Sequence, residues 1–369
     1  MTATDSAFGA ADYSHAKNDR IGVLFVNLGT PDAPQKPELK RYLKEFLSDP
    51  RIVEAPRWLW FLLLRLVILP TRSGKSAEAY REVWTERGSP LAYLSEDLSQ
   101  AVGERLADVN VEVALAMRYG QPSVASVLDK MAEKQVRRLL VVPMYPQYSA
   151  TTTASIFDAV TSHLQTRRWI PEVRFINEYF HTDAWVKAMA AHIAEHRAQL
   201  PQAERLLMSF HGIPRRYFLN GDPYYCQCQA SARLIAAELG LGEDDYAVTF
   251  QSRFGKEEWL QPYTDKTLES WGKQGMKRVQ VVCPGFAVDC LETLEEIAGE
   301  NREIFQEAGG GELDYIPALN AEAAHADAMA EIIRPHLNGW PAGLDAEALK
   351  TRQQRAEAQS EKAGYPLES

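Results

Sequence analysis

Eight short apolar segments, each running into a turn with glycine, proline or a polar residue, constrain the fold of this 369-residue chain most strongly. Longer segments with helical periodicity separate them, and strands of this kind are buried on both faces of a parallel sheet. They form two series of four, at 21–31, 111–122, 137–149 and 173–180, then at 205–214, 246–255, 278–289 and 313–320. The sequence therefore predicts an α/β protein with two doubly wound parallel sheets.

The two series resemble each other in order, which indicates an internal duplication. NLGTP corresponds to FHGIP, MRYG to SRFG, and PMYPQYS to CPGFAVD. We assign an N-terminal half to 21–175 and a C-terminal half to 176–337. Residues 1–20 read as a flexible polar leader, and 338–369 as a polar tail that is either a short helix or disordered.

Ligands of open parallel sheets bind at the carboxyl ends of the strands, so side chains at those ends are expected to face one cleft between the halves. These residues are His211, Arg118, Tyr119, Arg253, Tyr145, Gln147, Phe286 and Glu292. Only the second half carries titratable groups at two of the matched positions, because Leu28 stands opposite His211 and Thr151 opposite Glu292. A single histidine is often structural, but a strand-end position favours function.

An acidic segment follows the third strand of the second half. If 289–303 is an α-helix, Asp289, Glu292, Glu296, Glu300 and Glu303 share one face at spacings of three and four. Asp289 and Glu292 also have the spacing of a capping box, and a charged helix face is usually a solvated surface. Together with His211, however, Glu292 would suit a borderline divalent metal such as ferrous iron.

Composition narrows the function further. A net charge of −10 and a pI near 5.4 argue against a nucleic-acid surface. No signal peptide is visible, and four scattered cysteines fit free thiols in a reducing compartment, so we expect a cytoplasmic protein. The chain lacks a dinucleotide fingerprint, and SGKS at 73–76 is a false match to a phosphate-binding loop.

The segment WLWFLLLRLVIL, at 58–69, is strongly apolar but too short to cross a bilayer, which takes about 20 residues. It is either a buried core helix or, because arginines flank its two tryptophans, a helix at a membrane interface. We describe 47–70 as an apolar lip, with Trp58, Trp60, Phe61 and Leu62 expected to contact membrane or substrate.

Four motifs together, SFHGIP with NGDPYY, TFQSRFGKEEWLQPYTD, CPGFAVDCLETLEEI and VPMYPQYSATTT, resemble the ferrochelatase family from about Ile21 to Leu337. The resemblance implies a chelatase-like fold of two Rossmann-like halves. It also implies insertion of ferrous iron, as a substrate, into protoporphyrin IX with release of two protons, at the last step of haem biosynthesis. The enzyme would then be a lyase, bound at most peripherally to the cytoplasmic membrane.

The same resemblance implies roles for individual residues. His211 and Glu292 match the pair implicated in metal binding and proton removal. Asp289, Glu296 and Glu300 lie on a proton or iron path. The porphyrin-binding positions are Leu28, Arg118, Tyr119, Tyr145, Gln147, Trp259 and Phe286.

Other functions stay open on sequence grounds: a coproporphyrin chelatase, a chelatase for another metal, or a non-catalytic porphyrin or haem carrier. Leu28 and the apolar lip favour protoporphyrin IX, since members using coproporphyrin usually have tyrosine at that position and lack such a lip. Some members hold an iron–sulfur cluster on C-terminal cysteines. The tail here has none, so we expect no cluster and no tightly bound cofactor.

Overall fold

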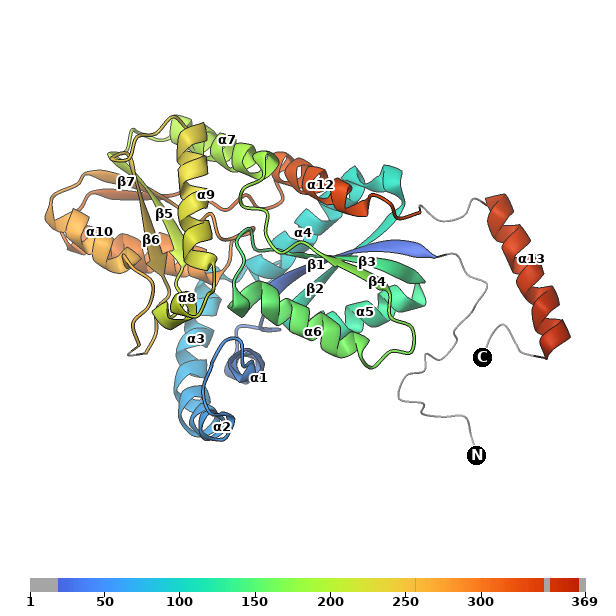
Figure 1. The fold of residues 1–369 in the computed structure, drawn as a ribbon. Helices are drawn as coiled ribbons and strands as arrows, with labels where there is room; N and C mark the ends of the chain where they lie inside the picture. Colours follow the sequence, from blue (N-terminus) through green and yellow to red (C-terminus); the bar gives the residue numbers. More distant parts are fainter. Residues whose placement is uncertain (1–18, 256, 342–345, 365–369) are drawn as a thin grey trace.

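Two four-stranded parallel sheets form the centre of the molecule (Figure 1). The computed structural model describes residues 19–255, 257–341 and 346–364. The first sheet has the order β2-β1-β3-β4, with β1 Arg20–Thr30, β2 Val111–Gly120, β3 Val136–Pro143 and β4 Glu172–Phe175. The second has the order β6-β5-β7-β8, with β5 Arg205–His211, β6 Tyr246–Gln251, β7 Arg278–Val282 and β8 Glu312–Tyr315. All eight predicted strands and the duplicated topology are confirmed.

Helices connect the strands in both halves. Those of the first half are α1 Lys36–Ser48, α2 Arg57–Leu63, the π-helix η1 Leu64–Ile68, α3 Leu69–Val83, α4 Pro90–Arg105, the 3₁₀ turn η2 Ala107–Val109, α5 Val124–Glu133, the π-helix η3 Ala150–Ala154 and α6 Ser155–Leu164. Helix α7, Asp183–Gln199, lies within 176–337 but follows β4 as α12 follows β8, so in the structural repeat we count it as the last helix of the first half. The second half contains α8 Arg215–Leu219, α9 Tyr224–Glu238, α10 Thr264–Lys273, the π-helix η4 Glu292–Asn301, α11 Arg302–Glu307 and α12 Ala323–Leu337.

The repeat extends to backbone contacts, which correct one of the predicted matches. Met117 N–H donates to the Pro122 carbonyl, and Phe250 N–H donates to the Pro262 carbonyl in the same way. Asn27 pairs with Met117 as Phe210 pairs with Phe250. The counterpart of Arg118 is therefore Gln251, and aligning MRYG with SRFG was wrong by two residues because the loop after β6 is longer.

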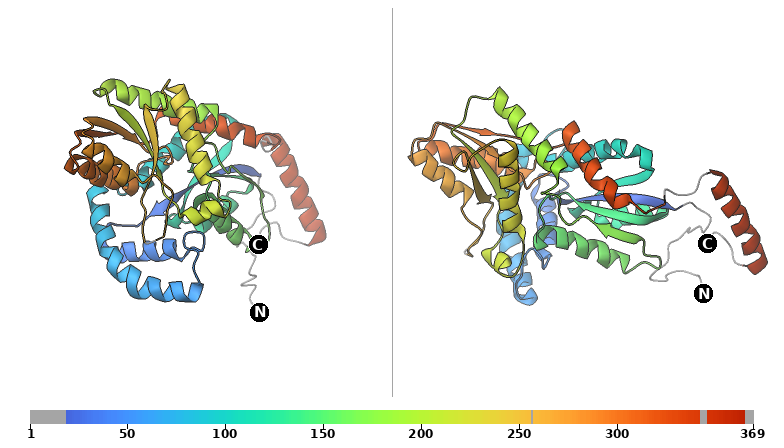
Figure 2. Two further views of the ribbon diagram at one scale, coloured as in Figure 1. Left: turned by 60° about the vertical axis from the view of Figure 1, so that its left-hand side comes forward. Right: turned by 45° about the horizontal axis from the view of Figure 1, so that its top comes forward.

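The last helix of each half packs against the other half. Helix α7 lies on α9, while α12 lies on α4 and α7 (Figures 1 and 2). Ion pairs Arg334–Asp108 and Arg105–Asp327 join α12 to the first half. One hydrophobic cluster contains Phe25 of the first sheet and Phe210 of the second. We call this exchange of α7 and α12 between the halves the crossover. It fixes the position of the carboxyl ends of one sheet relative to those of the other.

The helices of the predicted lip form a projection of their own, with α2 at its tip (Figure 2). A small cluster of Leu47, Trp60, Leu64 and Leu69 gives this projection its own core. Residues 1–18 of the predicted leader lie outside the described residues, as do 342–345 and 365–369 of the tail. The described part of that tail forms helix α13, Ala346–Ala363.

Candidate active site

His211 ends β5, the central strand that pairs with both β6 and β7. Its Nδ1 lies 2.6 Å from the carbonyl oxygen of Gly212. A carbonyl only accepts, so Nδ1 carries the hydrogen and, in the neutral ring, Nε2 keeps a lone pair. The partly exposed ring can therefore accept a proton or coordinate a metal through Nε2.

Gln251, at the end of β6, connects the His211 strand to Glu292. Its backbone carbonyl accepts a hydrogen bond from Gly212 N–H at 2.8 Å. Its side-chain Nε2 donates to the Glu292 carbonyl oxygen at 2.7 Å, and its Oε1 accepts from the Ser209 hydroxyl at 2.7 Å. One buried glutamine thus places the histidine and the glutamate at the same end of the second sheet.

Gly212 allows the end of β5 to lie close to the end of β6. A Cβ at this position would lie 2.8 Å from the Gln251 carbonyl oxygen and 3.1 Å from the Trp259 ring. Gly29 stands at the matching position of the first half, where a Cβ would lie 1.7 Å from the Tyr119 carbonyl oxygen. The glycine of NLGTP and FHGIP is therefore required by a close approach to a neighbouring strand in both halves, to Tyr119 in the first and to Gln251 in the second.

The acidic segment differs from the predicted α-helix. Glu292–Asn301 is a π-helix, in which hydrogen bonds to the fifth residue widen each turn, and π-helical turns are frequent at functional sites. Asp289 lies before it, and no side chain caps its N-terminal residue, so the capping box does not form. Glu292 and Glu296 are partly exposed, whereas Glu300 and Glu303 are exposed. The carboxylates thus run from the protein interior to solvent.

Asp289 is buried and its carboxylate is saturated with donors. The donors are the Tyr315 hydroxyl, the Thr293 hydroxyl at 3.0 Å, Ala318 N–H at 3.2 Å and the Asn320 amide at 2.8 Å. These contacts tie the start of η4 to the segment after β8. Asp289 therefore fixes the beginning of the helix.

Glu296 sits among polar groups of the β6 end. Its carboxylate accepts from Ser252 N–H at 2.7 Å and from the Ser252 hydroxyl. Burial is the largest influence and, with the nearby Glu292 charge, it outweighs these hydrogen bonds and raises the pKa of Glu296 to about 7. A carboxyl with such a pKa can gain and lose a proton near neutral pH.

The first half lines the other side of this region. Leu28 near the end of β1 and Tyr145 after β3 are partly exposed, as is Phe286 of the second half. Burial raises the pKa of Tyr145, and the nearby charges of Cys290 and Glu292 raise it further. Residues of both halves therefore meet at the carboxyl ends of the sheets, which we call the strand-end site.

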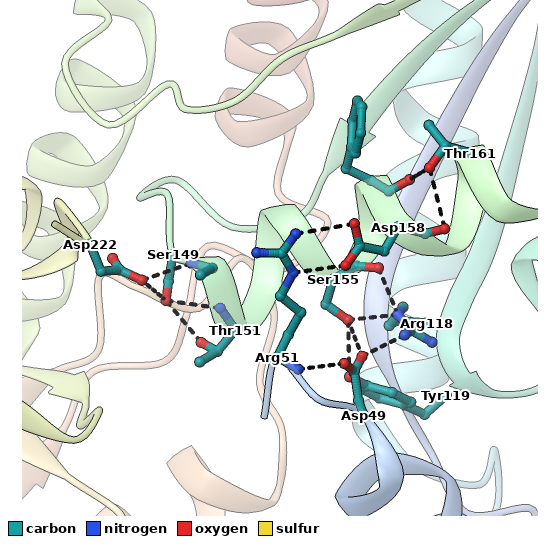
Figure 3. A network of polar contacts seen from close by, with 12 residues as sticks. Asp49, Arg51, Arg118, Tyr119, Ser149, Thr151, Ser155, Asp158, Thr161 and Asp222 are labelled. Carbon is teal, nitrogen blue, oxygen red and sulfur yellow. Dashed lines mark hydrogen bonds and ion pairs between the residues drawn. The ribbon is translucent and has the colours of Figure 1, made fainter. Parts of the chain in front are cut away.

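Arg118 and Tyr119 occupy a buried polar network shown in Figure 3. Tyr119 has only 1% exposure, and its hydroxyl donates to Asp49 at 2.8 Å. Arg118 binds Asp49 through Nη2 and the Ser155 hydroxyl through Nε at 2.7 Å. Tyr119 thus does not face the strand-end site in this structure. Both residues instead hold Asp49, at the root of the lip.

Asp49 keeps its charge in this network. Burial acts to raise the pKa of its carboxyl, but hydrogen bonds from Ser155, Arg51 N–H and Tyr119, with the Arg118 charge, outweigh burial and lower it. Beside it, Arg51 forms a two-point ion pair with Asp158 of α6, with one contact of 2.7 Å (Figure 3). The lip is therefore anchored to the first sheet by paired charges.

The remaining predicted site residues divide between the site and the interface. Trp259 is buried and bridges to Pro214, and its ring lies against Gly212, beside His211. Gln147 is buried and donates to Ser231 of α9 at 2.9 Å, so it joins the two halves. Arg253, also expected here, is exposed and forms an ion pair with Asp265 of α10.

The lip presents an exposed apolar surface. Trp58 and Leu66 are each 71% exposed, and Leu59, Phe61, Leu62, Leu63 and Val67 are also exposed. Trp60 differs from the prediction, because it is only 9% exposed. Its indole N–H donates to the Leu47 carbonyl at 2.6 Å, so its side chain attaches α2 to the end of α1. None of the described helices is long and apolar enough to cross a membrane.

The part of the chain that the structure describes does not meet the requirements of a metal site built from three or more side chains. No group of three or more histidine, cysteine, aspartate or glutamate side chains there is arranged to hold a metal ion. All four cysteines are free thiols. Burial, followed by the charge of Glu292 and a hydrogen bond to it, raises the pKa of the Cys290 thiol.

Comparison with known proteins agrees with this arrangement. A sirohydrochlorin chelatase from Bacillus subtilis subspecies spizizenii, solved with cobalt, superposes with a TM-score of 0.51 over 88% of this chain and 100% of its own, at 10% identity. The fold is therefore chelatase-like, and it carries a histidine and a glutamate at the strand ends of its second sheet.

The relatives define the family. Residues 20–337 match the ferrochelatase family. A ferrochelatase of Idiomarina loihiensis is 53% identical over 98% of this chain and 99% of its own length. One from Hydrogenovibrio crunogenus is 55% identical over 92% of both chains. The chain belongs to the ferrochelatase family.

Three residues that organise the site were not predicted from the sequence. Gln251 could have been found, because it is a polar residue inside the predicted strand segment 246–255. Asn320 ends the predicted strand segment 313–320, but a polar residue there gives no sign of a partner 31 positions away. Asp49 lies in a loop far from Arg118 in sequence and carried no signal at all.

Replacement of Glu296 by glutamine tests its raised pKa. Between pH 4.5 and 7 the folded state holds a proton that the unfolded state releases, so parent stability falls as pH rises through this window. Relative to Glu296→Gln, the parent free energy of unfolding should fall by about 3 kcal/mol over the window, measured by urea denaturation. Glu300→Gln, an exposed site on the same helix, is the control. A parent-to-variant difference independent of pH would contradict the assignment.

Proposed function

We propose that this ferrochelatase inserts ferrous iron into protoporphyrin IX, with His211 and Glu292 acting together on the metal and the pyrrole protons. Family membership makes the chain a lyase that inserts iron into a porphyrin in haem biosynthesis. The observation that carries the finer proposal is the junction at Gln251, which holds both residues at one end of the second sheet.

The chemistry needs a base and a metal ligand beside a porphyrin. A free porphyrin carries two N–H protons, and both leave when Fe²⁺ takes their place, so the products are the iron porphyrin and two protons. The unprotonated Nε2 of His211 is a suitable acceptor, because the Gly212 carbonyl fixes the hydrogen on Nδ1. Imidazole and carboxylate ligands together bind ferrous iron while leaving positions open for exchange.

Glu296 and Glu300 supply a route between the site and solvent. The Glu296 carboxyl, with its pKa near 7, lies between partly exposed Glu292 and exposed Glu300 on η4. It can take up a proton and release it outward, or pass iron inward. Asp289, with its four donors, supports this route by holding the start of η4.

The porphyrin lies, in this proposal, against apolar side chains from both halves. Leu28, Tyr145 and Phe286 are partly exposed at the strand ends, and Trp259 packs beside His211. Binding energy from such walls can be used to bend the macrocycle so that its nitrogens become accessible. Three further predicted residues support this region through hydrogen bonds: Arg118 and Tyr119 bind Asp49, and Gln147 binds Ser231.

The exposed lip supports delivery of a poorly soluble porphyrin. Seven exposed apolar side chains on one short segment form a patch suited to a membrane surface. Arg65 and Arg72 are stacked over Phe61 and Phe254, so cationic groups stand next to the apolar patch. We therefore propose peripheral contact with a membrane, which favours protoporphyrin IX over the more soluble coproporphyrin.

Anaerobic iron insertion, followed by loss of porphyrin fluorescence, tests the catalytic proposal. The parent should turn over protoporphyrin IX faster than coproporphyrin, and His211→Ala and Glu292→Gln should each lower kcat by about a hundredfold or more while porphyrin still binds. Porphyrin binding without turnover in the parent would indicate a carrier. Parent-like rates in both variants would exclude the proposed pair, and a preference for coproporphyrin would exclude the proposed substrate.

Sedimentation with vesicles containing phosphatidylglycerol tests the lip. Trp58→Ser combined with Phe61→Ser removes two exposed apolar side chains and should lower the bound fraction by about tenfold or more. Trp169→Ser combined with Ile170→Ser is the matched control, since both side chains are exposed outside the lip. Equal losses in the two double variants, or none in either, would rule out specific docking through the lip.

A further inference from the structure

The segment between β8 and α12, residues 316–322, lies outside every motif of the family resemblance and yet contacts the start of η4. Asn320 is its central residue. The backbone there has φ 48°, a left-handed conformation that asparagine tolerates better than most residues. Its N–H donates to the Ala287 carbonyl at 3.1 Å, which places its side chain beside Asp289.

Asn320 makes a two-point contact with Asp289. Its Nδ2 donates to the Asp289 Oδ2 at 2.8 Å, and its Oδ1 accepts from Asp289 N–H at 2.8 Å. The other carboxylate oxygen, Oδ1, accepts from the Thr293 hydroxyl at 3.0 Å. Thr293 directly follows Glu292, so the contact reaches the residue next to the proposed metal ligand.

Two buried histidines hold the other side of this segment. His192 on α7 places Nε2 at 2.8 Å from the Pro317 carbonyl oxygen and Nδ1 at 3.0 Å from a Glu322 carboxylate oxygen. Both partners are acceptors, so whichever nitrogen carries the ring hydrogen donates it to this segment. His325 on α12 donates from Nδ1 to the Asn320 carbonyl at 2.6 Å. Burial lowers the pKa of His325 to about 4, so that ring is neutral when it donates.

We propose that Asn320 is a positioning residue for iron insertion: it sets the orientation of Glu292 through Asp289 and Thr293, from a segment fixed by His192 and His325. The inference rests on the proposed role of Glu292. The segment is held on one face by histidines of the two crossover helices and is bonded on the other to Asp289, so it transmits the packing of the halves to the reacting groups.

Asn320→Gly is the sharpest test, because glycine adopts the same left-handed backbone and the change removes only the side chain. We expect kcat for iron insertion to fall by about tenfold, with the porphyrin Kd within about twofold of the parent value. Asn110→Gly is the matched control, since Asn110 has φ 50° and lies at the end of η2, outside the site. Rates are compared at a temperature where circular dichroism shows every variant folded.

The double variant Asn320→Gly with Glu292→Gln separates positioning from general destabilisation. If Asn320 acts through Glu292, the double variant is no slower than Glu292→Gln alone. A further tenfold loss in the double variant, or parent-like kcat in Asn320→Gly beside a collapsed Glu292→Gln, overturns this inference alone. Parent-like turnover in Glu292→Gln overturns the proposed role of Glu292 and this inference with it.

Discussion

The hydrogen bonds of Gln251 hold the strand-end site together. Through its carbonyl it fixes the turn after His211, and through its amide it fixes the backbone of Glu292. Neither residue contacts the other by any ion pair described for the structure, so their relation depends on this third side chain. A buried amide with defined partners on both atoms gives the geometry that paired metal binding and proton transfer require.

The crossover of α7 and α12 extends this constraint to the whole molecule. Each sheet alone would leave its last helix unpaired, but each helix covers the other half, and one hydrophobic cluster contains both sheets. The two strand ends therefore keep a fixed relation. The first half supplies apolar walls and the lip, and the second supplies the titratable groups. A duplicated fold has thus become asymmetric in function, with Leu28 opposite His211.

Sequence predicted the fold well because its signal is local. Eight apolar runs of strand length and the ordered matches between halves were sufficient to predict two parallel sheets related by duplication, but not the order of the strands within them. His211 and Glu292 were predicted from strand ends and from the family resemblance. The π-helix was not predicted, because carboxylates at spacings of three and four fit an α-helix equally well. The contacts that Glu296 receives from Ser252 and Asn301, and Asp289 from Thr293, are not encoded in that spacing.

Side-chain orientation was the least predictable feature. Trp60 lies in an apolar run with several exposed members, but it packs with Leu64 and Leu69 and donates a hydrogen bond to the Leu47 carbonyl. Tyr119 ends a strand but points to Asp49. Both orientations depend on hydrogen-bond partners elsewhere in the sequence, which the periodicity of apolar residues does not encode.

The most direct test of this account is the rate of anaerobic iron insertion by Gln251→Leu, which keeps His211 and Glu292 but removes the bond to the Glu292 carbonyl. The account predicts a loss of about tenfold to a hundredfold in kcat with porphyrin binding retained. A folded Gln251→Leu variant that inserts iron at the parent rate would contradict it, because the histidine and the glutamate would then need no common support.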